Sequence, residues 1–156
     1  MSDISPVAMS RLFTSLVGRD VRFAPLSAVP AESKSRQLYV TYSVLPDKEP
    51  LLVKTDLPLF GAMAGALVGL PYDSAIARAE ETPMPELIRD AIHEVLNVAS
   101  RGLSKDERVL LKGMAQDPVY LDGDVLRILK KPELTTYFKV TLANEIHGLF
   151  SILSRY

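Results

Sequence analysis

Apolar residues recur along this chain with two different spacings, and the spacing predicts where helices and strands lie. A helical period of three to four residues runs through three segments: 5–17, 58–68 and 85–101. Strand-like alternation of apolar and polar residues runs through six others: 21–26, 37–45, 51–54, 109–114, 135–142 and 148–153. Helices and strands come in runs, so we predict an α+β fold with a mostly antiparallel β-sheet and two or three helices packed on one face.

Local signals refine the predicted helices. Ser5 is placed to cap the first helix and Gly18 to end it, and Thr82 is expected to cap the third. Gly61 and Gly65 lie four residues apart in the apolar second helix, which indicates close packing of that helix against the sheet.

Turn signals organise the second half of the chain. Asp122-Gly123 is a strong turn dipeptide, and it is flanked by two short apolar segments, 119–121 and 125–129, that suit strands. The last two predicted strands surround a polar turn and are candidate edges of the sheet.

Composition narrows the class of protein. The 156 residues fit one domain, so we expect a single domain over 1–156. With 47% hydrophobic residues, 24% charged residues and a net charge of −1, the chain has no basic run for a nucleic-acid partner. No apolar stretch is long enough to span a membrane and residues 1–22 lack a signal-peptide pattern, so we expect a cytoplasmic protein without a membrane contact.

Metal chemistry is not favoured by the residues present. The chain has no cysteine, and its two histidines, His93 and His147, are far apart in sequence. Asp122 and Asp124 flank Gly123, but too few oxygen ligands follow for a calcium loop, so a turn is the better interpretation.

The segment 85–101 separates most cleanly into two faces. At about 100° per residue, one face gathers apolar side chains that we expect to be buried: Ile88, Ala91, Ile92, Val95, Leu96 and Ala99. The opposite face gathers four polar side chains in a line: Asp90, Glu94, Asn97 and Arg101. A polar outer face is ordinary for an amphipathic helix. An asparagine inside a helix, however, costs some tenths of a kcal/mol relative to alanine, which favours a task for this side chain.

The stretch from Asp90 to Asn97 follows the pattern Asp/Ser-x3-Glu-x2-Asn. It resembles the active-site helix of the CheC/CheX/FliY chemotaxis phosphatases, and the single motif per chain is closest to the CheX-like branch. The family pattern continues to a downstream proline, and here Pro118 follows after twenty intervening residues, a somewhat shorter interval than in the family. The glycine that usually follows the asparagine is displaced to Gly102.

The resemblance implies a function and a role for each residue. Family members hydrolyse the phosphoaspartate of a CheY-like receiver, which supplies its own Mg²⁺ and lysine, so no cofactor of this chain's own is expected. Asn97 would orient the attacking water and Glu94 would pair with the receiver's lysine. Asp90, Arg101 and Pro118 would contact the partner or shape the adjoining loop. A homodimer is also expected, because CheX-like proteins pair through their sheets.

Two alternatives remain open at this stage. The chain could bind a receiver without catalysis, as a module of a signalling assembly whose site is degenerate. It could also be an unrelated α+β interaction domain whose polar helix face is simply solvated.

Overall fold

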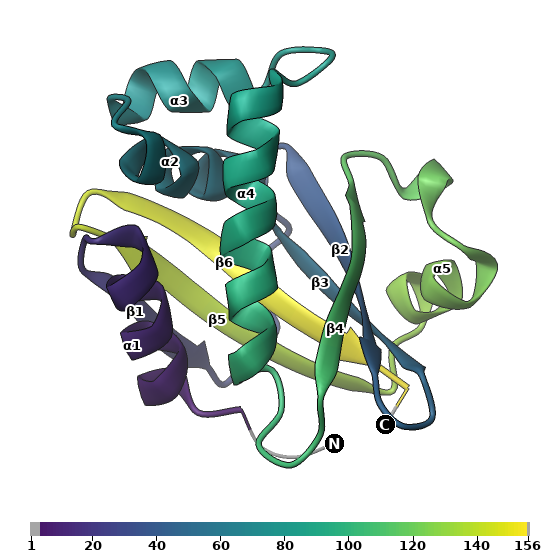
Figure 1. Cartoon of the computed structure of the whole chain (residues 1–156). Helices are drawn as coiled ribbons and strands as arrows, with labels where there is room; N and C mark the ends of the chain where they lie inside the picture. Colours follow the sequence, from purple (N-terminus) through teal and green to yellow (C-terminus); the bar gives the residue numbers. More distant parts are fainter. Residues whose placement is uncertain (1–3, 156) are drawn as a thin grey trace.

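The computed structural model describes residues 4–155, so residues 1–3 and 156, the ends of the predicted single domain, lie outside it. Its centre is a six-stranded antiparallel sheet with the strand order β1-β5-β6-β3-β2-β4 (Figure 1). The strands are β1 (Val21–Leu26), β2 (Gln37–Val44), β3 (Glu49–Asp56), β4 (Val109–Ala115), β5 (Leu134–Leu142) and β6 (Ile146–Ser154). The predicted α+β class with an antiparallel sheet is confirmed.

Three helices cover one face of this sheet: α1 (Pro6–Val17), α2 (Leu57–Val68) and α4 (Glu86–Ala99). A further helix, α3 (Tyr72–Ala79), packs on α2, and α5 (Gly123–Lys130) lies on the opposite face. Two 3₁₀ turns, η1 (Ser100–Gly102) and η2 (Pro118–Tyr120), complete the elements. Within residues 4–155, no helix is both long enough and apolar enough to cross a bilayer.

Alternation along β3 shows how the two faces are filled. Leu51 and Val53 belong to the main core beneath α1, α2 and α4, whereas Leu52 between them contacts α5 through Val125 and Ile128. Neighbouring residues of a strand point to opposite sides, so one strand serves both layers.

Aromatic side chains hold α1 and α2 on the sheet. Phe13 of α1 lies 4.8 Å from Phe23 of β1, and Phe60 of α2 stacks on Phe150 of β6 with a centroid distance of 6.1 Å. Such ring pairs contribute roughly 0.5–1.5 kcal/mol each beyond the area they bury.

The sheet has an internal twofold arrangement that the sequence does not reveal. Exchanging β1, β2 and β3 with β4, β5 and β6 reverses the strand order and leaves it otherwise unchanged. The two halves join along β3 and β6, where Val53 pairs with Ile152. In each half a helix, α1 or α4, precedes the strand that forms the sheet edge. The two helices therefore occupy equivalent positions in the two halves.

The segment after β4 differs from its prediction. Residues 119–121 and 125–129 are not strands around an Asp122-Gly123 turn, because Pro118–Tyr120 forms η2 and Gly123–Lys130 forms α5. Asp122 is the N-cap residue of α5, and the apolar Val125 and Ile128 repeat at a helical interval to cover the sheet. A short apolar run fits a strand or one side of a short helix equally well, and packing decides here for the helix.

Two smaller predictions are also wrong. The last two strands are not edges, since β5 lies between β1 and β6, and β6 lies between β5 and β3. The edges are β1 and β4. Thr82 does not cap α4. The helix begins after Pro85, because a residue before proline is held out of the helical conformation.

The paired glycines do mark a close approach, but to α3 instead of the sheet. A Cβ atom on Gly61 would lie 2.9 Å from the Cβ of Ala79, and one on Gly65 would lie 2.5 Å from the Cβ of Ala75. Only a residue without a side chain lets α3 come this near to α2. By contrast, Ser5 and Gly18 limit α1 as predicted, with the Ser5 side chain accepting a hydrogen bond from the backbone N–H of Ala8.

Candidate functional site

The helix α4 is seated on the sheet by the apolar face that the sequence predicts. All six predicted positions are buried: Ile88, Ala91, Ile92, Val95, Leu96 and Ala99. On the sheet side of α4, the hydroxyl of Tyr42 on β2 donates a 2.7 Å hydrogen bond to the carbonyl oxygen of Leu96. Burial raises the pKa of the Tyr42 phenol, which therefore stays protonated and remains a donor. The bond fixes the position of α4 relative to β2.

The opposite face of α4 carries Asp90, Glu94 and Asn97, and all three side chains are exposed to solvent. Within residues 4–155, none of the three side chains makes a hydrogen bond or an ion pair. Only the backbone oxygen of Asn97 is engaged, accepting a hydrogen bond from the hydroxyl of Ser100. Two carboxylates and a carboxamide thus lie along one face of a firmly held helix, with their hydrogen-bonding groups unused by the described chain.

Arg101 lies beyond the regular helix. The α-helix ends at Ala99, and Arg101 is carried by the tighter turn η1 with its side chain exposed. This turn abuts α1, because a Cβ atom on Gly102 would lie only 2.2 Å from the sulfur of Met9. Arg101 therefore follows the polar line but is held by a separate element.

Pro118 is on a different part of the molecule from the three α4 side chains. It is the first residue of η2, which follows the edge strand β4, and Asp117 caps this turn by accepting a 2.9 Å hydrogen bond from the N–H of Val119. Gln116 and Asp117 line a cavity of about 510 Å³ together with Thr82, Pro83 and Met84, the residues just before α4. The residues just before η2 and those just before α4 consequently border the same hollow.

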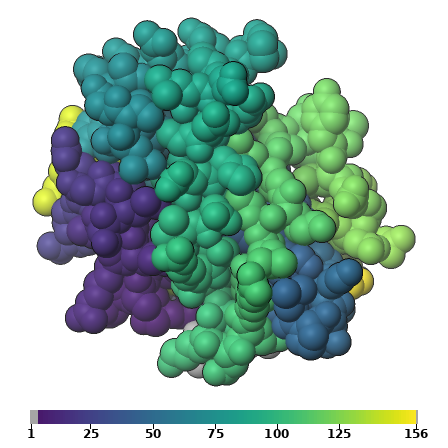
Figure 2. Space-filling view, in the orientation of Figure 1, coloured from purple at the N-terminus to yellow at the C-terminus, as the bar shows by residue number. Residues whose placement is uncertain are grey.

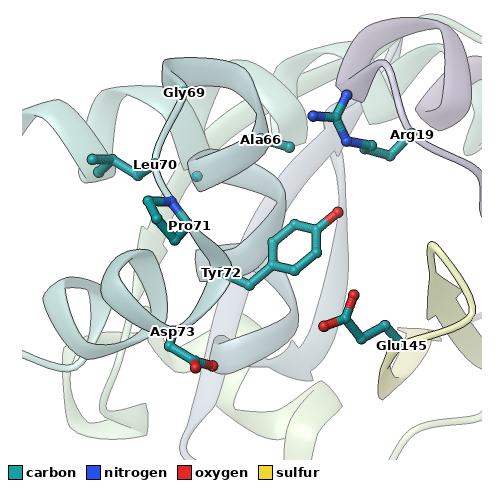
Figure 3. Close-up of a pocket in the computed structure, with 9 residues that line it drawn as sticks. Arg19, Ala66, Gly69, Leu70, Pro71, Tyr72, Asp73 and Glu145 are labelled. Atoms are coloured by element: carbon teal, nitrogen blue, oxygen red, sulfur yellow. The ribbon is translucent and has the colours of Figure 1, made fainter.

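Figure 3 shows a second cavity, of about 540 Å³, which has no lining residue from α4. Arg19, Tyr72 and Glu145 extend toward it from the end of α1, the start of α3 and the β5–β6 turn. All three side chains are partly or fully exposed, and the cavity opens widely to solvent. Among residues 4–155, no group of three histidine, aspartate or glutamate side chains is placed to hold a metal ion.

Sequence reasoning missed two features of this site. The hydrogen bond from Tyr42 to Leu96 of α4 joins residues 54 positions apart, and no local sequence pattern predicts it. Leu87 is the other: it lies on α4, in its first turn, and stays 58% exposed although it is large and apolar. Its position on the helical wheel beside Glu94 was readable from the sequence.

No protein-family model matches this chain, and no curated protein matches it in sequence. Solved structures do match in fold. FliY from Thermotoga maritima aligns with a TM-score of 0.63 and 14% identity over 97% of this chain and 84% of that one. The middle domain of FliM from H. pylori aligns with a TM-score of 0.64 and 10% identity over 96% and 84% of the two chains.

A third structure is a CheX–CheY complex with BeF3 and Mg²⁺ from Borrelia burgdorferi. It aligns with a TM-score of 0.55 and 11% identity over 99% of this chain and all of that one. The resemblance inferred from the α4 motif is thus confirmed at the level of the fold: the chain has the CheC/CheX/FliY fold, which it shares with chemotaxis proteins.

Proposed function

We propose that this chain is a phosphatase for the phosphoaspartate of a CheY-like receiver. One observation carries the proposal: Asp90, Glu94 and Asn97 lie exposed and unpaired along one face of a helix whose other face is locked to the sheet. A polar outer face alone is ordinary for an amphipathic helix, and the order of these three residues, which follows the pattern Asp/Ser-x3-Glu-x2-Asn, is what favours a site. The similarity to a CheX bound to CheY supports the choice of partner.

The chemistry asked of the chain is positioning. Water attacks the phosphorus atom in line, its oxygen forms the new bond, and the bond to the aspartyl oxygen breaks. A carboxylate and inorganic phosphate result, and the proton leaves with the phosphate or to solvent. The Asn97 carboxamide suits the task because it both donates and accepts hydrogen bonds and so can orient a neutral water molecule. Holding the nucleophile in line is a large part of catalysis in phosphoryl transfer.

The other residues would hold the two proteins together. Glu94 pairs with the receiver's lysine, and Asp90, one turn earlier, orients Glu94 or contacts the receiver directly. Asp90 and Asn97 are seven residues apart, about 10 Å along the helix. This spacing lets Asp90 contact the edge of the receiver's pocket while Asn97 enters it. Arg101 adds a partner contact beyond the helix end. The Mg²⁺ ion belongs to the receiver.

The test is a phosphate-release assay with receivers from the same organism, each phosphorylated by a small-molecule phosphodonor. We expect the wild-type chain to accelerate release from at least one receiver, and Asn97→Ala to reduce the stimulated rate roughly 100-fold or more. Ser15→Ala, at a polar position on α1 that is also exposed, serves as the matched control. If Asn97→Ala dephosphorylates as fast as Ser15→Ala, the assignment of a phosphatase is wrong.

A second candidate is a receiver-binding module without catalysis. Two observations favour it: the similarity to FliM, and the shortened interval between Asn97 and Pro118. Binding to a receiver held in its active form by beryllofluoride, without any acceleration of phosphate release, would select this candidate over the phosphatase.

A further inference from the structure

We propose that the face of the sheet opposite α4 carries a binding site for a small organic anion, with Lys54 as its cationic group. The site is a further cavity, of about 240 Å³, which is lined in part by Leu129 of α5 and Leu153 of β6. Both leucines belong to the small apolar core on the α5 side of the sheet. Figure 2 shows the other side, which α1 and α4 cover. The proposal goes beyond the proposed function and does not depend on it.

The strand register brings three polar side chains together at this cavity. Lys54 of β3 is paired with Ser151 of β6, and Ser151 is paired in turn with Tyr137 of β5. Residues directly opposite each other on antiparallel strands point to the same face, with roughly 5 Å between their Cβ atoms. All three residues line the cavity. One ammonium group and two hydroxyl groups therefore form a row across three neighbouring strands.

The polar atoms of this row are left unused by the part of the chain that the structure describes. Within it, the hydroxyls of Ser151 and Tyr137 make no hydrogen bond. Lys54 has one charged neighbour there, Glu32, whose carboxylate lies 3.8 Å from Nζ, beyond hydrogen-bond distance. The Lys54 side chain is only 26% exposed, and an ammonium group so far removed from water is costly without acceptors for its three donors. A bound anion would supply those acceptors.

The walls of the cavity indicate the character of the ligand. Besides the two leucines, Val29 and Pro30 of the connection between β1 and β2 contribute apolar surface, as does Leu149 of β6. A few convergent polar groups among apolar walls are typical of small-molecule sites. A cavity of about 150 Å³ is enough to hold benzene, so about 240 Å³ has room for a ring that carries one acidic group. The ligand class is therefore a monocarboxylate with a compact apolar body.

Glu32 marks the position of the ligand's acidic group. It belongs to the connection between β1 and β2, lines the same cavity and places its carboxylate opposite Lys54. The Glu32 side chain is 87% exposed, and an ion pair with so exposed a partner contributes little. The ligand's carboxylate can therefore replace that of Glu32, with the hydroxyls of Ser151 and Tyr137 as additional donors. Removing the charge of Glu32 should strengthen binding, so the test includes a gain of affinity as well as losses.

The test is calorimetric titration of the full chain with benzoate, and with benzamide as a neutral ligand of the same shape. We expect saturable binding of benzoate, with a Kd in the millimolar range or below, and at least tenfold weaker binding of benzamide. Lys54→Gln should weaken benzoate binding about tenfold, and Tyr137→Phe and Ser151→Ala should weaken it about threefold each. Glu32→Gln should strengthen it about threefold. Lys139→Gln should change nothing, because Lys139 lies on the same face of β5 but does not line the cavity.

Four results would overturn the proposal. They are the absence of saturable benzoate binding, equal affinity for benzamide, an affinity in Lys54→Gln within twofold of that in Lys139→Gln, and unchanged or weaker binding in Glu32→Gln. Inorganic phosphate is the last probe, because phosphate that binds as tightly as benzoate would contradict the apolar body of the ligand. Urea unfolding of Lys54→Gln checks its fold, and the gain expected for Glu32→Gln cannot arise from unfolding. No receiver is present, so these outcomes leave Asn97-dependent dephosphorylation unaffected.

Discussion

The helices α1 and α4 occupy equivalent places in the two halves of the fold, yet they present different surfaces. Each precedes an edge strand and packs on the same face of the sheet. Each buries an apolar stripe, formed in α1 by Met9, Phe13 and Val17. The exposed residues of α1 are Val7, Ala8, Arg11 and Ser15, with no acid and no amide among them, whereas α4 exposes Asp90, Glu94 and Asn97.

The ends of the two helices differ as well. α1 is closed at both ends by its own residues, with the Ser5 side chain at the start and Gly18 in the left-handed conformation at φ 74°. α4 begins after Pro85 without a side-chain cap and continues into the 3₁₀ turn η1. A hydrogen bond from Tyr42 of the sheet holds it in place. The comparison teaches that burial places a helix in this fold, while the outer residues, which burial leaves free, decide whether it can carry a site.

The largest expected difference between α1 and α4 comes from replacing the exposed polar residues of each helix in turn. Glu94→Ala with Asn97→Ala should reduce stimulated dephosphorylation roughly 10³-fold, because the two groups that we propose to position water and to pair with the receiver's lysine are both lost. Arg11→Ala with Ser15→Ala on α1 should leave the rate within about twofold. Equal rates for the two double variants would mean that α4 has no special role.

Next in size is the contact between α1 and η1, the turn that follows α4, at Gly102. In Gly102→Ala the new Cβ would overlap the buried side chain of Met9 on α1, which we expect to lower the free energy of unfolding by about 1–3 kcal/mol. Gly113→Ala is the control, since a Cβ there meets nothing within 4 Å. Urea unfolding of both variants measures the difference, and equal midpoints would contradict this account of the contact.

The tie from Tyr42 to α4 gives a smaller effect. Tyr42→Phe should reduce the free energy of unfolding by about 1 kcal/mol, because a buried hydrogen bond to Leu96 is lost. The raised pKa adds a signature. Above pH 10 the phenol ionises in the unfolded chain but stays protonated in the folded one, so the stability of the wild type falls as pH rises. The stability advantage of the wild type over Tyr42→Phe should therefore shrink between pH 8 and 11, and a constant difference between the two proteins would argue against this tie.

The smallest expected effect concerns the helix ends. Ser5→Ala should lower the free energy of unfolding by about 0.5–1 kcal/mol, because the N–H of Ala8 loses its acceptor. Thr82→Ala, at the position wrongly expected to cap α4, should cost less. Thermal unfolding of the two variants ranks them, and a larger loss for Thr82→Ala would reverse this account of the helix starts.

Sequence patterns were reliable where the structure depends on near neighbours. The buried stripe of α4 and the paired strands β2–β3 and β5–β6 follow from apolar residues a few positions apart. Ser5 and Gly18 mark the start and the end of α1 through local hydrogen bonds. The same helical periodicity predicts that Asp90, Glu94 and Asn97 lie on the exposed face of α4. These parts needed no knowledge of the remainder of the chain.

Patterns failed where distant segments decide the outcome. The sheet order depends on pairings such as Val21 with Leu142, which no local spacing encodes, so the edges were misplaced. The sequence after Asp122 fits one strand of a hairpin as well as a helix, and its burial against Leu52 of β3 makes it a helix. The twofold arrangement stayed hidden because the two halves share strand order but not residues.

The bond from Tyr42 to the backbone of α4 has a kinetic consequence. A helix held in this way keeps one shape before and after an encounter, so capture of a receiver would involve no slow refolding of the recognition element. Association should then proceed at the ordinary rate for two rigid surfaces, about 10⁵–10⁷ M⁻¹s⁻¹, and the lifetime of the complex, not its speed of formation, would distinguish one receiver from another.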